Sequence, residues 1–319
     1  MAPPALLDRR LLFVTGKGGV GKTTVASALA LLAADHGRRV LLVEVDSKGD
    51  VARLLGAERL GFDAREVAPG VLAMAMDTEA SLREYLKLNL RVPVFGRLGP
   101  VARVFDFVAT AAPGVKEILT IGKICWEVRE AIAGRADHDL VIVDAAATGH
   151  IVAQLGAAET LQELVDVGLI RSQTDWMREL LSDPEVTSVN IVTTPEEMPV
   201  AETIELAGRL SAEVSVPLGY VVVNRVLPEL FTTADEATFE ALRAPEPMAL
   251  LASRAGSGAE AVLDGARLAV SLRRTRAEHL QELRSAVDLA MLYVPYLFVR
   301  APGLRVARMV ADALGAELV

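Results

Sequence analysis

A glycine-rich run near the N-terminus constrains the fold of this chain more than any other feature. Residues 16–24 read Gly-Lys-Gly-Gly-Val-Gly-Lys-Thr-Thr, which fits the phosphate-loop pattern G-x-x-x-x-G-K-[ST]. An apolar segment at residues 11–15 precedes the run, and a longer one at residues 25–34 follows it and ends near Gly37. A phosphate loop requires a strand, a loop and a helix in this order. We therefore predict a nucleotide-binding loop between the first strand and the first long helix.

The residue types of the run suit an anion. Four of its residues lack side chains and let backbone N–H groups turn inward: Gly16, Gly18, Gly19 and Gly21. The helix N-terminus adds unpaired N–H groups and a partial positive charge. We expect Lys22 to contact the β- and γ-phosphates of a nucleotide and the Thr23 hydroxyl to hold Mg²⁺.

Composition narrows the class of protein. The chain has 319 residues, of which 52% are hydrophobic, enough for a large core in one or two domains. No uncharged apolar run approaches the ~18–20 residues that span a bilayer, and the first ten residues do not resemble a secretory signal, so we expect a cytoplasmic protein without an integral membrane segment. The net charge of −9 argues against a nucleic-acid partner. The single cysteine, Cys125, lies in an apolar helical series, which predicts a core residue.

Short apolar runs rich in β-formers alternate with helical stretches along the chain. The predicted strands are Leu11–Thr15, Val40–Val45, Val71–Met76, Leu140–Asp144, Val189–Thr193, Tyr220–Asn224 and Leu292–Val299. Most are continuous rather than alternating apolar runs, which is typical of a parallel sheet covered by helices on both faces. Right-handed crossovers then predict an α/β fold with a doubly wound, mostly parallel sheet and the nucleotide at the carboxyl edge of the strands.

One crossover is too long for a single helix. About sixty residues separate Met76 from Leu140, and they divide into three helical pieces, the last of which carries Cys125. We predict a helical insertion subdomain, residues 78–138, standing above the sheet within a single P-loop domain of residues 1–319. Another long helix is expected over Ala259–Leu283.

Carboxylates close two of the predicted strands. Asp144 follows an apolar strand, and an aspartate there supports Mg²⁺ through a water molecule, although it could instead cap a helix. Asp46 closes the second strand, where it could orient the attacking water or serve as an N-cap or turn residue. Residues 145–150 read Ala-Ala-Ala-Thr-Gly-His and predict a small-residue loop in which the Gly149 N–H approaches the γ-phosphate. His150 could relay the nucleotide state or be a structural histidine.

An amide and a guanidinium follow a later strand. Asn224 and Arg225 come directly after the strand that begins at Tyr220. Because the carboxyl ends of parallel strands meet at one edge of a sheet, we expect the Asn224 amide to read the edge of an adenine there, with Arg225 in the same pocket.

Together these motifs resemble a known family. The loop with an additional lysine at Lys17 is similar to the deviant phosphate loop shared by MinD/ParA proteins, the nitrogenase iron protein and ArsA. Residues 144–150 narrow the resemblance to ATPases of the ArsA/GET type, which typically show Asp-x-Ala-Pro-Thr-Gly-His. The insertion with Pro113-Gly114 and a downstream Glu117, and Asn224 after its strand, agree with that family.

The resemblance implies a Mg²⁺-dependent ATPase that works as a nucleotide-gated dimer, either a homodimer or a heterodimer with a related ATPase. Lys17 would reach the phosphates on the partner subunit, Lys22 would serve its own nucleotide, and Asp46 would hold the attacking water. The remaining residues would form the phosphate site (Val20, Thr23 and Thr24), the second switch (Thr148, Gly149 and His150) and the adenine pocket (Asn224 and Arg225).

The chain also departs from the family pattern. Ala147 stands where the family has proline, so the second switch should be less constrained. Residues 46–49 read Asp-Ser-Lys-Gly instead of the common Asp-Pro-Ala-His. The cysteines that bind metalloid in the arsenite pump, its paired ATPase halves and the zinc-bridging Cys-x-x-Cys of the eukaryotic targeting factor are absent.

The sequence leaves three functions open. In the first, the ATP-bound dimer holds and releases a protein client; a hydrophobic helix such as a tail anchor is one candidate, given the apolar residues Leu98, Val101, Val104 and Phe105 of the insertion. An insertion packed on itself is the alternative explanation of these residues. The second function is a MinD/ParA-like positioning ATPase, although the mixed charges of residues 305–319 predict weak membrane affinity. The third is a nucleotide-binding regulatory subunit of a heterodimeric ATPase.

Overall fold

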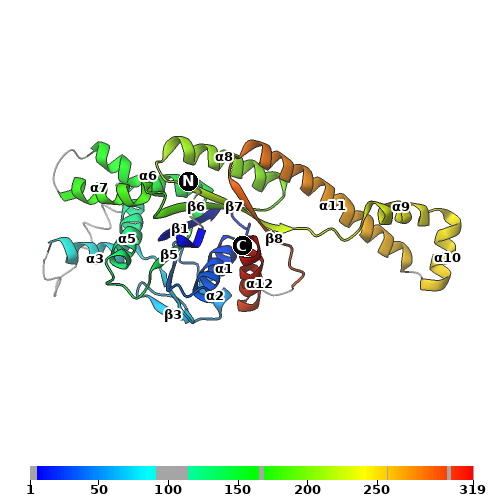
Figure 1. Ribbon diagram of the computed structural model, residues 1–319, viewed down its shortest axis with the longest axis horizontal. Coiled ribbons are helices and arrows are strands. Elements are labelled where there is room, and N and C mark those ends of the chain that lie inside the picture. The colour runs from blue at the N-terminus through cyan, green and yellow to red at the C-terminus, as the bar shows by residue number, and fades with distance from the viewer. Residues whose placement is uncertain (1–5, 91–113, 165–168, 257, 300–302, 319) are drawn as a thin grey trace.

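The fold is built on one eight-stranded sheet with helices on both faces (Figure 1). The computed structural model describes residues 6–90, 114–164, 169–256, 258–299 and 303–318. The strands are β1 (Leu11–Gly16), β2 (Val40–Glu44), β3 (Arg65–Ala68), β4 (Val71–Ala75), β5 (Leu140–Ala147), β6 (Thr187–Thr193), β7 (Leu218–Val226) and β8 (Ala290–Pro295). Their order across the sheet is β3-β4-β2-β5-β1-β6-β7-β8.

Helices precede, connect and follow these strands. A short 3-10 helix, η1 (Leu6–Asp8), leads into β1. The α-helices are α1 (Lys22–Asp35), α2 (Asp50–Leu55), α3 (Thr78–Leu90), α5 (Val115–Ile132), α6 (Thr148–Leu164), α7 (Leu169–Ser182), α8 (Glu197–Glu213), α9 (Thr233–Leu242), α10 (Pro245–Ala255), α11 (Ala259–Ala286) and α12 (Leu304–Glu317). Among the described residues, no helix is long and apolar enough to cross a membrane.

The structure confirms the predicted doubly wound sheet. All seven predicted strands are present, and every neighbouring pair is parallel except β3 with β4. The sequence analysis missed β3, because this short edge strand is polar and only partly buried and so lacks the apolar run that marks the other strands.

Alternate residues of each central strand supply two separate cores. In β1, Leu12 and Val14 pack with α1, α2 and α12, whereas Leu11 and Phe13 pack with α5, α6, α7 and α8 on the opposite face. This alternation follows from the two-residue period of a strand. A sheet buried on both faces needs apolar residues at every position, which explains the continuous apolar runs in the sequence.

The predicted insertion is part of one of these cores. Helix α5 places Ile121, Ile124, Cys125 and Val128 against the sheet, so it lies on the sheet rather than above it. Cys125 is a buried core residue, as predicted, and burial raises the pKa of its thiol. The middle predicted piece, with Leu98 to Phe105, falls outside the described residues, and the limits 78–138 remain a prediction.

The long helix predicted over Ala259–Leu283 is α11, and it extends well beyond the sheet. Its C-terminal end packs on α8 and buries Leu283, while its N-terminal half forms a projecting arm with α9 and α10 (Figure 1). Because the arm leaves the sheet, apolar side chains such as Val262 and Leu268 remain exposed. Helical periodicity predicted the helix but carried no information about how far it extends from the sheet or which way it points.

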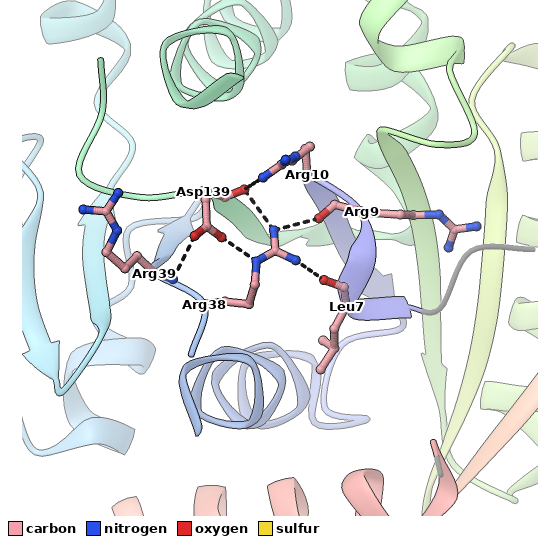
Figure 2. Close-up of polar contacts among 6 residues, drawn as sticks. All are labelled: Leu7, Arg9, Arg10, Arg38, Arg39 and Asp139. Carbon is pink, nitrogen blue, oxygen red and sulfur yellow. Dashed lines mark hydrogen bonds and ion pairs between the residues drawn. The ribbon is translucent and has the colours of Figure 1, made fainter. Parts of the chain in front are cut away.

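One guanidinium joins the amino-terminal ends of the central strands (Figure 2). Arg38, just before β2, donates from Nε to Asp139 Oδ1 at 2.5 Å and from Nη2 to the Asp139 carbonyl at 3.0 Å. It also donates to the carbonyl oxygens of Leu7 and Arg9, which precede β1. These contacts tie β1, β2 and β5 together at the edge opposite the glycine-rich loop.

We predict that Arg38→Ala lowers the free energy of unfolding by about 2–3 kcal/mol, because Arg38 makes several charge-assisted hydrogen bonds in a partly buried position. Nucleotide affinity should not change, because these contacts lie at the far edge of the sheet. Urea unfolding measures the first effect and calorimetric titration the second. Arg209→Ala, which removes an exposed ion pair with Glu213, is the matched control and should leave the unfolding midpoint unchanged. Equal effects of the two substitutions would contradict the assignment.

Candidate active site

The glycine-rich loop connects β1 to α1 as predicted, and two glycines make its path possible. Gly16 has φ of +140°, and a Cβ there would lie 2.1 Å from the Val192 carbonyl oxygen on the neighbouring strand. Gly21 has φ of +100° and is the N-cap of α1, and no side-chain cap hydrogen bond is found at this helix start among the described residues. The N–H groups of the first helical turn are therefore available to an anion.

Asn224 supports this loop from the interior. It is buried near the end of β7, and its Nδ2 donates to the Val20 carbonyl oxygen at 2.8 Å. A Cβ at position 21 would lie 2.4 Å from the same Nδ2, so the amide occupies the space behind the loop. This supporting contact was not predicted. The expected adenine contacts of Asn224 and of the neighbouring, exposed Arg225 stay predictions.

A pocket of about 300 Å³ opens on the other side of the loop. It is lined by loop residues and by the ends of β2 and β5 with the segments that follow them: Gly18, Gly19, Gly21, Lys22, Thr23, Thr24, Glu44, Asp46, Lys48, Asp50, Arg53, Leu54, Asp144, Ala145 and Ala147. Eight of the residues predicted for the site meet in this pocket. The other predicted residues (Gly16, Lys17, Val20, Thr148, Gly149, His150, Asn224 and Arg225) are not part of its lining.

Thr23 and Asp144 meet inside the pocket. The Thr23 hydroxyl donates to Asp144 Oδ2 at 2.7 Å, which joins the start of α1 to β5. Burial raises the pKa of Asp144 to about 7, an effect that the Thr23 hydrogen bond and the Lys22 ammonium oppose and that the carboxylates of Glu44 and Asp46 reinforce. Asp144 Oδ1 is buried and has no hydrogen-bond partner among the described residues. The structure thus places a buried carboxylate, incompletely hydrogen-bonded among the described residues, beside a hydroxyl.

The two lysines of the loop have different surroundings. Lys22 Nζ donates to the Lys17 carbonyl oxygen at 3.3 Å, and burial lowers the pKa of Lys22 despite the nearby carboxylates. Lys17 instead turns toward α8, where its Nζ lies 2.5 Å from Glu202 Oε1 in a partly buried ion pair. The sequence analysis did not find Glu202, because nothing in the sequence links position 202 to the loop.

The segment after β2 holds Asp46 at the pocket rim. Asp46 is exposed and pairs with Lys48 at 3.1 Å, while Ser47 adopts a left-handed backbone with φ of +50° and donates from Oγ to the Met76 carbonyl oxygen at 2.5 Å. Asp46 therefore stands at the solvent-exposed rim of the pocket. Its role toward water remains a prediction.

The segment after Asp144 differs from the predicted loop. Strand β5 continues to Ala147, and α6 begins directly at Thr148. The extension forms because the small side chains of Ala145 and Ala146 are buried beside β1 and the Thr15 hydroxyl donates to the Ala146 carbonyl oxygen at 2.9 Å. Gly149 and His150 consequently stand exposed in the first turn of α6.

Glu44 is a pocket residue that the sequence analysis overlooked. It is the last residue of β2 and only 2% exposed, and its Oε1 accepts from the backbone N–H of Asp50 at 2.7 Å. A signal was present in the sequence, since a carboxylate inside an otherwise apolar buried strand is costly unless it has partners.

We predict that Asp144→Asn stabilises the metal-free protein at pH 8. The raised pKa means that the folded state holds the proton more tightly than the unfolded state, so this group favours folding below pH ~4 and loses that contribution as the pH rises toward 7. The gain at pH 8 should be on the order of 2–4 kcal/mol and should shrink at pH 5. Thermal melting in EDTA measures it, and a variant that melts below the wild type at pH 8 would contradict the prediction.

Comparison with known proteins places this site in a family. The family described as Anion-transporting ATPase matches residues 9–175 and 170–247. ATPase BagA of Mycobacterium tuberculosis is 36% identical over 232 residues, which cover 71% of this chain and 68% of that protein. An arsenical pump-driving ATPase of Acidiphilium multivorum is 31% identical over 252 residues, 73% of this chain and 41% of the relative. ATPase GET3 of Komagataella phaffii is 25% identical over 253 residues, 68% of this chain and 72% of that protein.

The family match runs from the start of β1 to the arm and so contains the whole pocket. The phosphate loop, the Thr23–Asp144 contact and this match agree with one another. The chain therefore belongs to the anion-transporting ATPase family, of the ArsA/GET type that its motifs resemble, and is an ATPase.

Proposed function

We propose that this ATPase uses Mg²⁺·ATP to close and open a dimer that binds and releases a protein client. The observation that carries the proposal is the pocket in which the uncapped start of α1, the Lys22 ammonium and the Thr23–Asp144 pair face one another. Backbone N–H groups and a lysine suit the phosphates of a nucleotide, whereas a hydroxyl beside a carboxylate suits a hard cation.

The residues of the pocket fit Mg²⁺. Asp144 has a buried oxygen without a hydrogen-bond partner in the described part of the chain, and Thr23 offers a hydroxyl beside it. Among the described residues, no group of three or more His, Cys, Asp or Glu side chains could hold a metal ion by itself. This agrees with Mg²⁺, which usually binds through one or two carboxylates together with substrate phosphates. When bound, Mg²⁺ would neutralise the charge on the phosphates.

Catalysis would then depend on positioning and electrostatics, with no covalent intermediate. Lys22 stabilises the charge of the phosphates, and the α1 N–H groups hold their oxygens in place. Asp46, at the exposed rim, orients the attacking water. Gly149 and its neighbours Thr148 and His150, at the start of α6, respond to the presence of the γ-phosphate.

The dimer is proposed from the additional lysine and from the family. Lys17 stabilises charge on the nucleotide of the partner subunit, as the resemblance implies. In this structure Lys17 is held by Glu202 of its own chain, so dimerisation must replace that ion pair with contacts to phosphate. Exchange of one anionic partner for another makes the lysine sensitive to the nucleotide.

The family resemblance supports a hydrophobic helix as one candidate for the client, bound by the insertion subdomain of residues 78–138. A membrane-positioning role has less support, because α12 buries its apolar face in the core against α1 through Ala307, Val310, Ala311 and Leu314. A helix whose apolar face is already covered has little to offer a bilayer.

We predict that Lys17→Ala lowers the turnover number about 10³-fold and leaves ATP affinity within about two-fold, because Lys17 acts on the partner's transition state. Lys22→Ala should weaken both turnover and affinity, because Lys22 touches its own nucleotide in every state. Steady-state phosphate release and calorimetric titration separate the two. Lys116→Ala, an exposed lysine away from the pocket, is the control. Normal hydrolysis by Lys17→Ala would show that the cross-dimer role is wrong.

We further predict that Asp46→Asn retains an ATP-bound dimer and slows hydrolysis about 10²-fold, because the amide keeps the shape of the side chain and loses its basicity. Light scattering with ADP, ATP and a non-hydrolysable analogue measures the assembly. The ATP-locked dimer is also the material on which a labelled apolar helix can be titrated, and absence of binding at micromolar concentrations would remove that client. Loss of ATP affinity in Asp46→Asn would assign the carboxylate a structural role instead.

A further inference from the structure

Two neighbouring strands end in buried carboxylates at the same level of the sheet. Strands β2 and β5 are parallel, and their register pairs Glu44 with Asp144. Both side chains are buried, and both line the pocket formed with the phosphate loop. The Glu44 carboxylate is among the groups that raise the pKa of Asp144, which agrees with their closeness. The sheet itself thus brings two negative charges together beside Thr23.

Each of these carboxylates uses one oxygen in hydrogen bonds, and its other oxygen has no partner in the part of the chain that the structure describes. Glu44 Oε1 accepts from the N–H groups of Asp50 and Val51 at 2.7 and 3.5 Å, and Asp144 Oδ2 accepts from Thr23 at 2.7 Å. Glu44 Oε2 and Asp144 Oδ1 are buried and have no hydrogen-bond partner among the described residues. Lys22 does not fill either role, because the hydrogen bond found for its Nζ goes to the Lys17 carbonyl oxygen.

A buried carboxylate oxygen without a partner is costly, and two such oxygens in one pocket cost more because the charges repel. A divalent cation with its bound waters would satisfy both oxygens at once. Two carboxylate oxygens are suitable ligands for a cation and its bound waters, whereas they would repel an anionic phosphate.

We propose that Glu44 is a positioning residue of the divalent-cation site, in which its Oε2 acts beside Asp144 and Thr23 on the cation or on water bound to it. This inference rests on the proposed use of Mg²⁺·ATP and adds a residue that the motifs did not identify. Glu44 closes a buried apolar strand, and its hydrogen bonds to α2 engage Oε1, which leaves Oε2 for the cation site.

The other oxygen of Glu44, Oε1, connects the cation site to helix α2 and to the segment before it. Oε1 holds the first N–H groups of α2, and the five residues between Glu44 and Asp50 include Asp46 and the left-handed Ser47. Occupancy of the cation site therefore bears on the position of the segment that carries Asp46. The Glu44 carboxylate thus links the cation to the segment that carries Asp46.

The test compares Glu44→Gln with the wild type in binding of Mn²⁺, a spectroscopic substitute for Mg²⁺, in the presence of a saturating non-hydrolysable ATP analogue. Glutamine keeps an oxygen for the α2 N–H groups and places an NH₂ group where Oε2 lies. We expect Mn²⁺ affinity, measured by electron paramagnetic resonance, to fall about ten-fold or more, since partners around a metal typically contribute 10–100-fold. Affinity for the analogue in EDTA should be unchanged.

The control is Glu66→Gln, in which an exposed carboxylate that accepts from the Gly70 N–H is changed in the same way far from the pocket. It should bind Mn²⁺ as the wild type does. Hydrogen exchange of the Asp50 and Val51 amides checks that Glu44→Gln retains α2, so a loss of Mn²⁺ affinity with protected amides supports the proposal. If Glu44→Gln binds Mn²⁺ as tightly as the wild type, Glu44 only caps α2 and the inference is wrong. If the wild type itself binds neither Mn²⁺ nor the analogue, the proposed function fails as well.

Discussion

Parallel pairing of β1, β5 and β2 is the constraint on which the rest of the structure depends. Because the three strands run in the same direction, their carboxyl ends reach one edge of the sheet together. The phosphate loop follows β1, Asp144 lies near the end of β5, and Glu44 ends β2, so one register assembles groups that are far apart in the chain. A shift of β5 relative to β1 would separate Thr23 from Asp144.

The two ends of the strands differ in how completely their polar groups are hydrogen-bonded. At the amino-terminal edge, Arg38 and Asp139 satisfy one another and the carbonyl groups around them, which favours stability (Figure 2). At the carboxyl edge, the described residues give no hydrogen-bond partner to one buried oxygen each of Asp144 and Glu44 and no side-chain cap to the first N–H groups of α1. A ligand that supplies the missing partners lowers the free energy of such a site. The well-bonded opposite edge offsets the cost of leaving these groups unsatisfied in the absence of the ligand.

The candidate site also connects to the projecting arm and to the segment after β2. Lys17 is tied to Glu202 on α8, and α8 packs against the C-terminal end of α11, whose other end forms the projecting arm. Glu44 connects the pocket to α2 and to the segment with Asp46. The Lys17–Glu202 contact is an ion pair, and Glu44 makes charge-assisted hydrogen bonds to α2. A bound nucleotide would compete for Lys17, and a bound cation would add a partner to Glu44. Both contacts thus link ligand binding to conformation.

The sequence alone determined the class of sheet, the phosphate loop and most of the strands, because continuous apolar runs and a glycine pattern depend on local chemistry. It also placed Thr23, Lys22 and Asp144 at one site, since the phosphate-loop motif and an aspartate after a parallel strand meet at the same edge of the sheet. Only the tertiary structure decided that Asn224 lies behind the loop, that Glu202 holds Lys17, that β5 runs on to Ala147 and that Glu44 stands beside Asp144. These contacts join residues that are distant in the sequence. Such contacts produce no local or periodic sequence pattern from which they can be predicted.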